Sequence, residues 1–199
     1  PGLLKALGRN LRYQQDRVRL FETGKVFLQA EKLIEKEMLG AVVCGSAQPE
    51  QWGTERRPVD FFDLKGDLER LLALRGVGGA VTFGPSERAF LHPGQRAEVL
   101  IDGQQAGWIG ALHPLSQKVV GIKPRVFAFE VELESILVRE VPNAKNISQY
   151  PSVRRDLAFL VPEACNYAQI KQLVHELAGG LLNDLIIFDQ FSGQSLEKG

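Results

Sequence analysis

Leucines recur at helical spacing in two stretches of the chain. The first runs over residues 3–13, and the second follows Asp60. Asp60 and Asp63 stand where the positive end of a helix dipole favours carboxylates. The second stretch therefore predicts an amphipathic helix that covers one face of a sheet. Its apolar stripe is spaced at i, i+4, i+7 and i+8 and consists of Leu64, Leu68, Leu71 and Leu72.

Short apolar runs, several of them with a period of two, predict the strands of that sheet. We expect strands at residues 18–28, 38–46, 80–83, 97–101, 105–112 and 126–133. Asp102 and Gly103 form a strong hairpin signal between two of these strands. The charged residues 31–37 are expected to form a loop or a short helix, and residues 113–120 a short helix. Strands, helices and a hairpin in this order predict an α+β domain with a mainly antiparallel sheet flanked by helices.

Residues 139–149 are polar and contain Pro142, which predicts a linker. The expected domains are therefore residues 1–138 and residues 150–199. In the second domain the pattern predicts a strand at 155–161, a helix at 167–178 and a strand at 185–191. This is a β-α-β unit.

Charge and length narrow the function classes. The 199 residues carry 24 basic and 24 acidic side chains, so any contact with RNA must be local. No apolar run is long enough to span a bilayer, so no membrane partner is expected. Cys44 and Cys165 stand far apart in apolar surroundings, which favours buried free thiols in a reducing cytoplasm over a disulfide. The chain starts without Met and stops after a strand-like run, so we expect a segment of a longer protein.

The sequence contains no pattern that predicts a catalytic residue, a cofactor site or a metal ligand. The acidic group Asp60, Asp63, Asp67 and Glu69 fits helix capping and a solvated face better than a metal site. Three scattered histidines lack ligand spacing. The glycines at 76–79 follow a helix and precede a strand, which is the wrong order for a phosphate-binding loop.

Arg154 and Arg155, with Tyr150 nearby, are the best candidates for contact with nucleic acid. Adjacent residues of a strand point to opposite faces, so at most one of the two arginines can face a given ligand. Asp156 is also placed to neutralise its neighbour. The residues alone favour a solvated strand start, with an RNA contact as the alternative.

Seven strings are spread over essentially the whole chain: RLFETG at 19–24, RPVDFFDLKGDLE at 57–69, LHPGQ at 91–95, GALHP at 110–114, FEV at 129–131, YPSVRRDLA at 150–158 and FDQFSG at 188–193. In this order they resemble the β subunit of bacterial phenylalanyl-tRNA synthetase. The resemblance implies a class II synthetase-like but non-catalytic domain at 1–138. ATP, magnesium and the amino-acid chemistry would then belong to the α subunit, elsewhere in the holoenzyme.

This implied division agrees with the residues. Class II chemistry needs one arginine on a second-motif strand and another in a Gly-rich third motif. Arg19 with Glu22 resembles the first, but no Gly-rich segment with an arginine follows residues 127–133. The resemblance also implies a cytoplasmic (αβ)2 assembly that docks tRNA(Phe). Leu4, Phe61 and Phe62 are candidates for the subunit interface, with core packing as the alternative.

The second domain is similar to the start of a ferredoxin-fold anticodon-binding domain. That fold has the spatial strand order 4-1-3-2, so its first two strands are not neighbours. We therefore expect this domain to be incomplete, rearranged or completed by another chain. Two other functions stay open: a stand-alone RNA-binding module, and a small-molecule enzyme with an unrecognised site between the domains.

Overall fold

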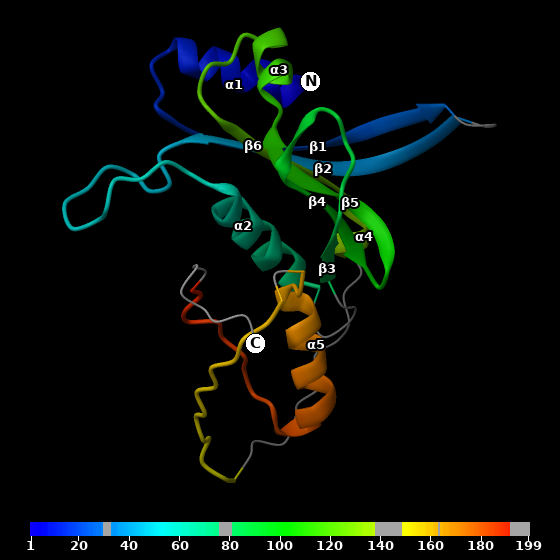
Figure 1. Ribbon diagram of the computed structural model, residues 1–199. Helices are drawn as coiled ribbons and strands as arrows, with labels where there is room; N and C mark the ends of the chain where they lie inside the picture. Colours follow the sequence, from blue (N-terminus) through cyan, green and yellow to red (C-terminus); the bar gives the residue numbers. More distant parts are fainter. Residues whose placement is uncertain (30–32, 76–80, 138–148, 163, 192–199) are drawn as a thin grey trace. The chain divides into compact units, whose positions relative to one another are not determined.

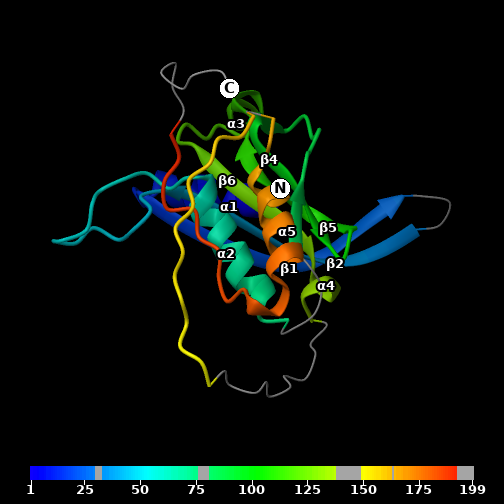
Figure 2. The ribbon, with the colours of Figure 1, turned by 60° about the horizontal axis from the view of Figure 1, so that its bottom comes forward.

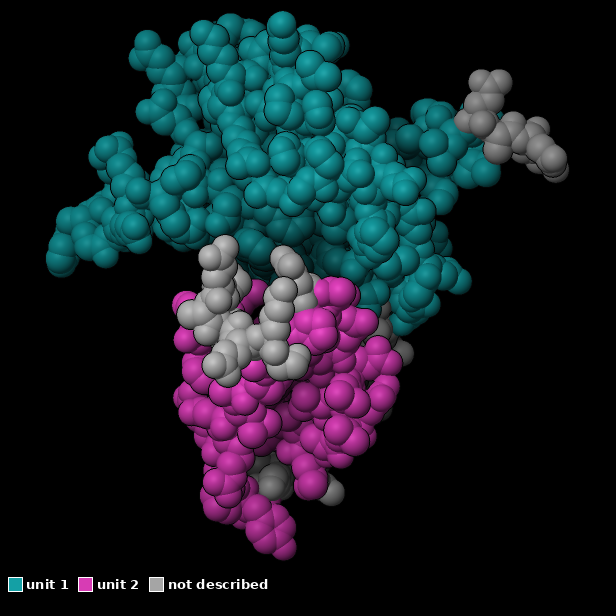
Figure 3. All heavy atoms as spheres, viewed as in Figure 1, with its two compact units in different colours: residues 1–145 teal, residues 146–199 magenta. Residues whose placement is uncertain are grey.

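The computed structural model describes residues 1–29, 33–75, 81–137, 149–162 and 164–191. The chain divides into two compact units, residues 1–145 and residues 146–199, which are coloured separately in Figure 3. The linker expected at 139–149 lies outside the described residues, apart from Gln149.

Six antiparallel strands form the sheet of the first unit, in the order β1-β2-β6-β5-β4-β3 (Figure 1). Asp102 and Gly103 join β4 to β5 with φ angles of 54° and 76°, the positive values that a two-residue hairpin loop requires. The predicted α+β class, antiparallel sheet and hairpin are confirmed. The strands are Arg17–Gln29 (β1), Leu33–Gly45 (β2), Val81–Gly84 (β3), Leu91–Ile101 (β4), Gln104–Leu112 (β5) and Val126–Glu132 (β6).

The hairpin of β1 and β2 is longer than the pattern predicts. Its two 13-residue strands pair without a register shift, and the hairpin extends beyond the other strands (Figures 1 and 2). The loop or helix expected at 31–37 is wrong from Leu33 onward. From Leu33 onward the residues form a strand because their backbone pairs with β1. Lys25 and Glu35 add an ion pair between the two strands.

Two helices cover opposite faces of the sheet. Helix α2, Phe61–Ala73, buries Leu64, Leu68 and Leu72 on one face, as predicted. Helix α1, Gly2–Arg12, buries Leu7 on the other. Successive side chains of a strand point to opposite faces, so β2 contributes to both cores. Leu39, Ala41 and Val43 pack on the α2 side, and Val42 and Cys44 pack on the α1 side.

Two short helices complete the first unit. Helix α3, Pro114–Val119, follows β5 as predicted. The strand predicted to reach residue 133 ends at Glu132, and helix α4, Leu133–Leu137, begins directly after it. Among the described residues, no helix is long and apolar enough to cross a membrane.

The second unit contains helix α5, Tyr167–Ala178, and a 3-10 turn, Gly179–Leu181. The helix is confirmed, and Asn166 and Gln169 cap it reciprocally. The strands predicted at 155–161 and 185–191 are wrong, because the described residues there join no ladder. A strand requires a paired neighbour, and the expected topology places a third strand between these two. None of the described side chains of this unit is buried.

Candidate functional site

Helix α2 begins in a network of two carboxylates and one arginine. The backbone N–H of Asp63 donates to the Asp60 carboxylate, and that of Asp60 donates to the Asp63 carboxylate, both at 2.9 Å. Arg57 donates two further hydrogen bonds of 2.7 Å to Asp63. Those bonds from Arg57 are the main cause that lowers the pKa of Asp63 to about 2. The predicted capping role of these acids is confirmed.

The other two carboxylates of the acidic group are paired as well. Asp67 forms an ion pair with Arg19, and Glu69 forms one with Lys65 a helical turn away. The part of the chain that the structure describes contains no group of three potential metal ligands. The geometry therefore supports capping and charge pairing for this acidic group.

Arg19 resembles the cation of a class II second motif, but it does not face an open site. Its guanidinium is held by Asp67 of α2, and its pKa is lowered, first by burial and then by the charge of Arg17. Glu22 follows three residues later on β1, so its side chain lies on the opposite face of the sheet. The structure does not bring Arg19 and Glu22 together.

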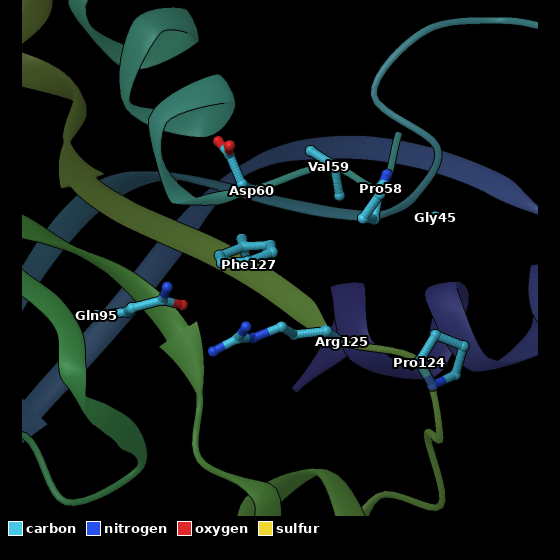
Figure 4. Close-up of a pocket in the computed structure, with 8 residues that line it drawn as sticks. All are labelled: Gly45, Pro58, Val59, Asp60, Gln95, Pro124, Arg125 and Phe127. Atoms are coloured by element: carbon cyan, nitrogen blue, oxygen red, sulfur yellow. The ribbon is translucent and has the colours of Figure 1, made fainter. Parts of the chain in front are cut away.

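A pocket of about 240 Å³ lies beside the N-terminus of α2, and we name it the Arg125 pocket. Gln95 and Arg125 extend toward each other across it, whereas Asp60 turns its carboxylate toward α2 (Figure 4). The Arg125 guanidinium lies 5.6 Å from the centre of the Phe127 ring. The lining residues are Gly45, Pro58, Val59, Asp60, Gln95, Pro124, Arg125 and Phe127.

A second pocket of about 280 Å³ adjoins the first at Gln95, and we name it the Phe83 pocket. Its walls come from α2, β3 and β4. The residues are Phe61, Phe62, Lys65, Phe83, Gly94, Gln95, Arg96 and Ala97. Sequence reasoning did not propose Gln95, Phe83 or Arg125 as site residues. The string at 91–95 is the signal that points to this region.

The nucleic-acid candidates lie together in the second unit, ahead of α5. Tyr150, Arg154 and Arg155 are all exposed, with Tyr150 at 85%. The Nε of Arg154 donates a 3.0 Å hydrogen bond to Asp156, so part of its charge is neutralised as expected. An RNA contact through these residues stays a prediction.

The three interface candidates differ in exposure. Leu4 packs partly buried against the core under α1, and Phe61 packs partly buried against the core under α2. Phe62 is 75% exposed and meets Phe61 edge-on, with the ring centres 5.6 Å apart. Phe62 is therefore the candidate whose side chain is open to a partner.

Two histidines form local hydrogen bonds, and the two cysteines are not paired with each other. His92 and His113 each accept a hydrogen bond of 3.2 Å at Nδ1 from a backbone N–H two residues later. Both cysteines are free thiols, and burial raises the pKa of Cys44. Cys165 is partly exposed, contrary to the expectation that both are buried. The glycines at 76–79 lie outside the described residues.

Comparison with known proteins places these features in a family. The family described as "Phenylalanyl tRNA synthetase beta chain CLM domain" matches residues 1–133, and the "Ferredoxin-fold anticodon binding domain" matches residues 148–199. A "Phenylalanine--tRNA ligase beta subunit" of Xanthomonas campestris pv. campestris is 47% identical over 203 residues, covering 100% of this chain. Those of Pseudomonas syringae pv. tomato and Xylella fastidiosa are each 43% identical, over 99% and 100% of this chain.

The chain spans about a quarter of the length of these relatives, since it covers 25% of each. The two family matches follow one another along the chain, as the two units of the structure do. The first match alone covers most of the 199 residues and includes the whole six-stranded sheet. The chain therefore belongs to the phenylalanyl-tRNA synthetase β chain family.

Proposed function

We propose that this chain is a non-catalytic scaffold within a phenylalanine–tRNA ligase. The observation that carries the proposal is the pairing of Arg19 with Asp67. A cation that holds ATP phosphates must be free to meet them, whereas Arg19 is neutralised by a carboxylate of the same chain. Arg19, which resembles a catalytic cation, instead forms an ion pair that links β1 to α2.

The partners proposed for this scaffold are the α subunit, in an (αβ)2 assembly, and tRNA(Phe). ATP and magnesium would act in the α subunit rather than in this segment, and the assembly would be cytoplasmic. The relatives are named as β subunits of the ligase, which supports a partnership between subunits. The match to an anticodon-binding domain supports tRNA docking through the second unit.

Two measurements test this function. The purified chain should give no ATP–pyrophosphate exchange above the buffer background, whereas a complete α and β ligase assayed in parallel provides the positive control. Mixed with an α subunit, the chain should co-elute with it in size-exclusion chromatography. Exchange by the chain alone would refute the non-catalytic role, and separate elution would refute the scaffold role.

A further inference from the structure

The loop between β2 and α2 carries the most exposed large apolar side chain in the part of the chain that the structure describes. That side chain is Trp52, which is 96% exposed, and we name residues 46–60 the Trp52 loop. The loop projects beyond the sheet in both ribbon views (Figures 1 and 2). Tryptophan is highly buried on average in folded proteins, so an indole left almost wholly in water needs a reason.

The base of the Trp52 loop is fixed to the sheet and to α2. Ser46 and Pro58 form an antiparallel bridge, and the Ala47 N–H donates to the Arg57 carbonyl oxygen at 3.0 Å. The Arg57 side chain in turn donates two hydrogen bonds of 2.7 Å to Asp63 of α2. The loop therefore leaves the first unit at a defined position.

The tip of the loop is an ordered turn. Gly53 has a φ of 78°, a left-handed value that glycine adopts without strain. The Gln51 side chain donates a 2.9 Å hydrogen bond to the Thr54 hydroxyl, which closes the turn around Trp52 and Gly53. A side chain held out by an ordered turn loses less conformational freedom on binding than one on a slack loop. The turn is thus suited to present the indole to a partner.

The charges of the loop favour a protein partner over nucleic acid. Arg56 and Arg57 are the only basic residues within 46–60. Arg56 forms an ion pair with Glu50 at 2.8 Å, and Arg57 forms one with Asp63 at 2.7 Å. Binding to phosphates requires cations that are free to meet them. A neutral indole with one N–H donor instead suits an apolar protein pocket, and tryptophan is enriched among the side chains that dominate binding energy at protein interfaces.

We propose that Trp52 anchors this chain to its partner subunit, with the indole inserted into an apolar pocket of the α subunit. This inference rests on the proposed function, which makes the α subunit the partner of the scaffold. The Trp52 loop leads directly into α2, where Phe62 is the interface candidate that is open to a partner. The anchor and that candidate therefore belong to one continuous stretch of the chain.

The test measures binding of the full chain and its variants to the α subunit by calorimetry and by co-elution. Trp52→Ala should weaken binding about thirtyfold or more, because a tryptophan anchor carries a large share of the binding energy. Trp52→Phe keeps an aromatic ring and should recover part of that loss. Gln48→Ala, at an exposed side chain of the same loop, is the matched control and should bind as the parent does.

Fluorine labels test whether the indole itself becomes buried. A chain grown with 5-fluorotryptophan carries one label at Trp52 and one at Trp108, and the Trp52→Phe chain assigns the two resonances. Unlabelled α subunit should shift the Trp52 resonance and remove its sensitivity to exchange of H₂O for D₂O. The Trp108 ring packs against Phe90, so its resonance should stay in place. Urea unfolding followed by Trp108 verifies the fold of each variant.

The outcomes separate this inference from the proposed function. If the parent binds the α subunit and Trp52→Ala binds equally well, the anchor is refuted while the scaffold role stands. A parent chain that does not bind the α subunit would overturn both. A Trp52 resonance that responds to tRNA instead would indicate a base-stacking site. One that shifts when the chain alone is concentrated would indicate contact between copies, and either result would overturn the inference.

Discussion

The charge of Asp63 should stabilise the first unit at neutral pH, and acid should remove this stabilisation. Replacing it by Asn (Asp63→Asn) removes the carboxylate but keeps an oxygen that accepts from the backbone N–H of Asp60. The variant therefore isolates the ionic pairing with Arg57 from the cap itself. We expect it to unfold more easily at neutral pH.

The magnitude follows from the pKa and the exposure of the pair. A fall in the pKa of Asp63 from 3.8 to about 2 corresponds to about 2.5 kcal/mol of stability at neutral pH. That is an upper bound, because the side chains of Asp63 and Arg57 are 19% and 44% exposed and water screens their charges. After screening, we expect Asp63→Asn to lower the free energy of unfolding by about 1 kcal/mol.

The sign of the pH dependence is fixed by the direction of the shift. The pKa of Asp63 is lower in the folded chain, so acid protonates the unfolded chain first and favours unfolding. The stabilisation is complete above about pH 4 and is lost as the pH falls toward 2. The difference between parent and variant should therefore shrink to about half of its neutral value near pH 3.

Urea unfolding followed by tryptophan fluorescence measures this difference. Trp52 and Trp108 are the two tryptophans of the chain and both lie in the first unit. The Trp108 ring packs edge-on to Phe90 at 5.0 Å between ring centres, so its emission should report unfolding.

The control is Glu87→Gln, at an exposed carboxylate with no ion pair among the described residues; it should change stability by less than about 0.5 kcal/mol. A parent-to-variant difference that is equal at pH 7 and pH 3 would refute the ionic explanation.

Three further changes test the core, the outer face of α2 and the RNA alternative. Gly107→Ala should destabilise by about 3 kcal/mol or more in the same urea assay, because its Cβ would lie 2.1 Å from the Glu130 carbonyl oxygen; parent-like unfolding would show that β5 and β6 can separate there. Gly66→Ala should stabilise the chain by about 0.5–1 kcal/mol, because the added methyl group would meet no described atom within 4 Å apart from its chain neighbours and the backbone of its own helix. If the outer face of α2 contacts the α subunit, the same change should weaken co-elution; unchanged co-elution would remove Gly66 from the interface. Replacing Arg154 and Arg155 by Ala should reduce the salt slope of tRNA binding by about one per lost phosphate contact, and an unchanged slope would remove the RNA contact.

Local spacing was enough to predict α2 and its cap. Asp60 and Asp63 stand three residues apart, and the buried leucines Leu64, Leu68 and Leu72 stand four apart, so each interaction lies within one helical turn. The hairpin at Asp102 and helix α5 follow from equally short-range signals. The strings that mark the family are also short, local patterns, so they could be identified without coordinates.

Pairing between distant segments decided the rest. Residues 33–37 look polar enough for a loop, yet they become strand because β1 offers a ladder beside them. Residues 155–161 look like a strand, yet they join no ladder in the described chain. A strand forms only where a neighbour supplies its hydrogen bonds, and spacing along the sequence does not specify that neighbour.

The features of the candidate site also divide into those that the sequence determines and those that the tertiary structure determines. The sequence by itself determined the family and the capped helix. Only the tertiary structure decided that Asp67 neutralises Arg19, and that Gln95 and Arg125, 30 residues apart, face each other across a pocket. Such contacts depend on how the strands and α2 come together, and this long-range packing leaves no local pattern in the chain.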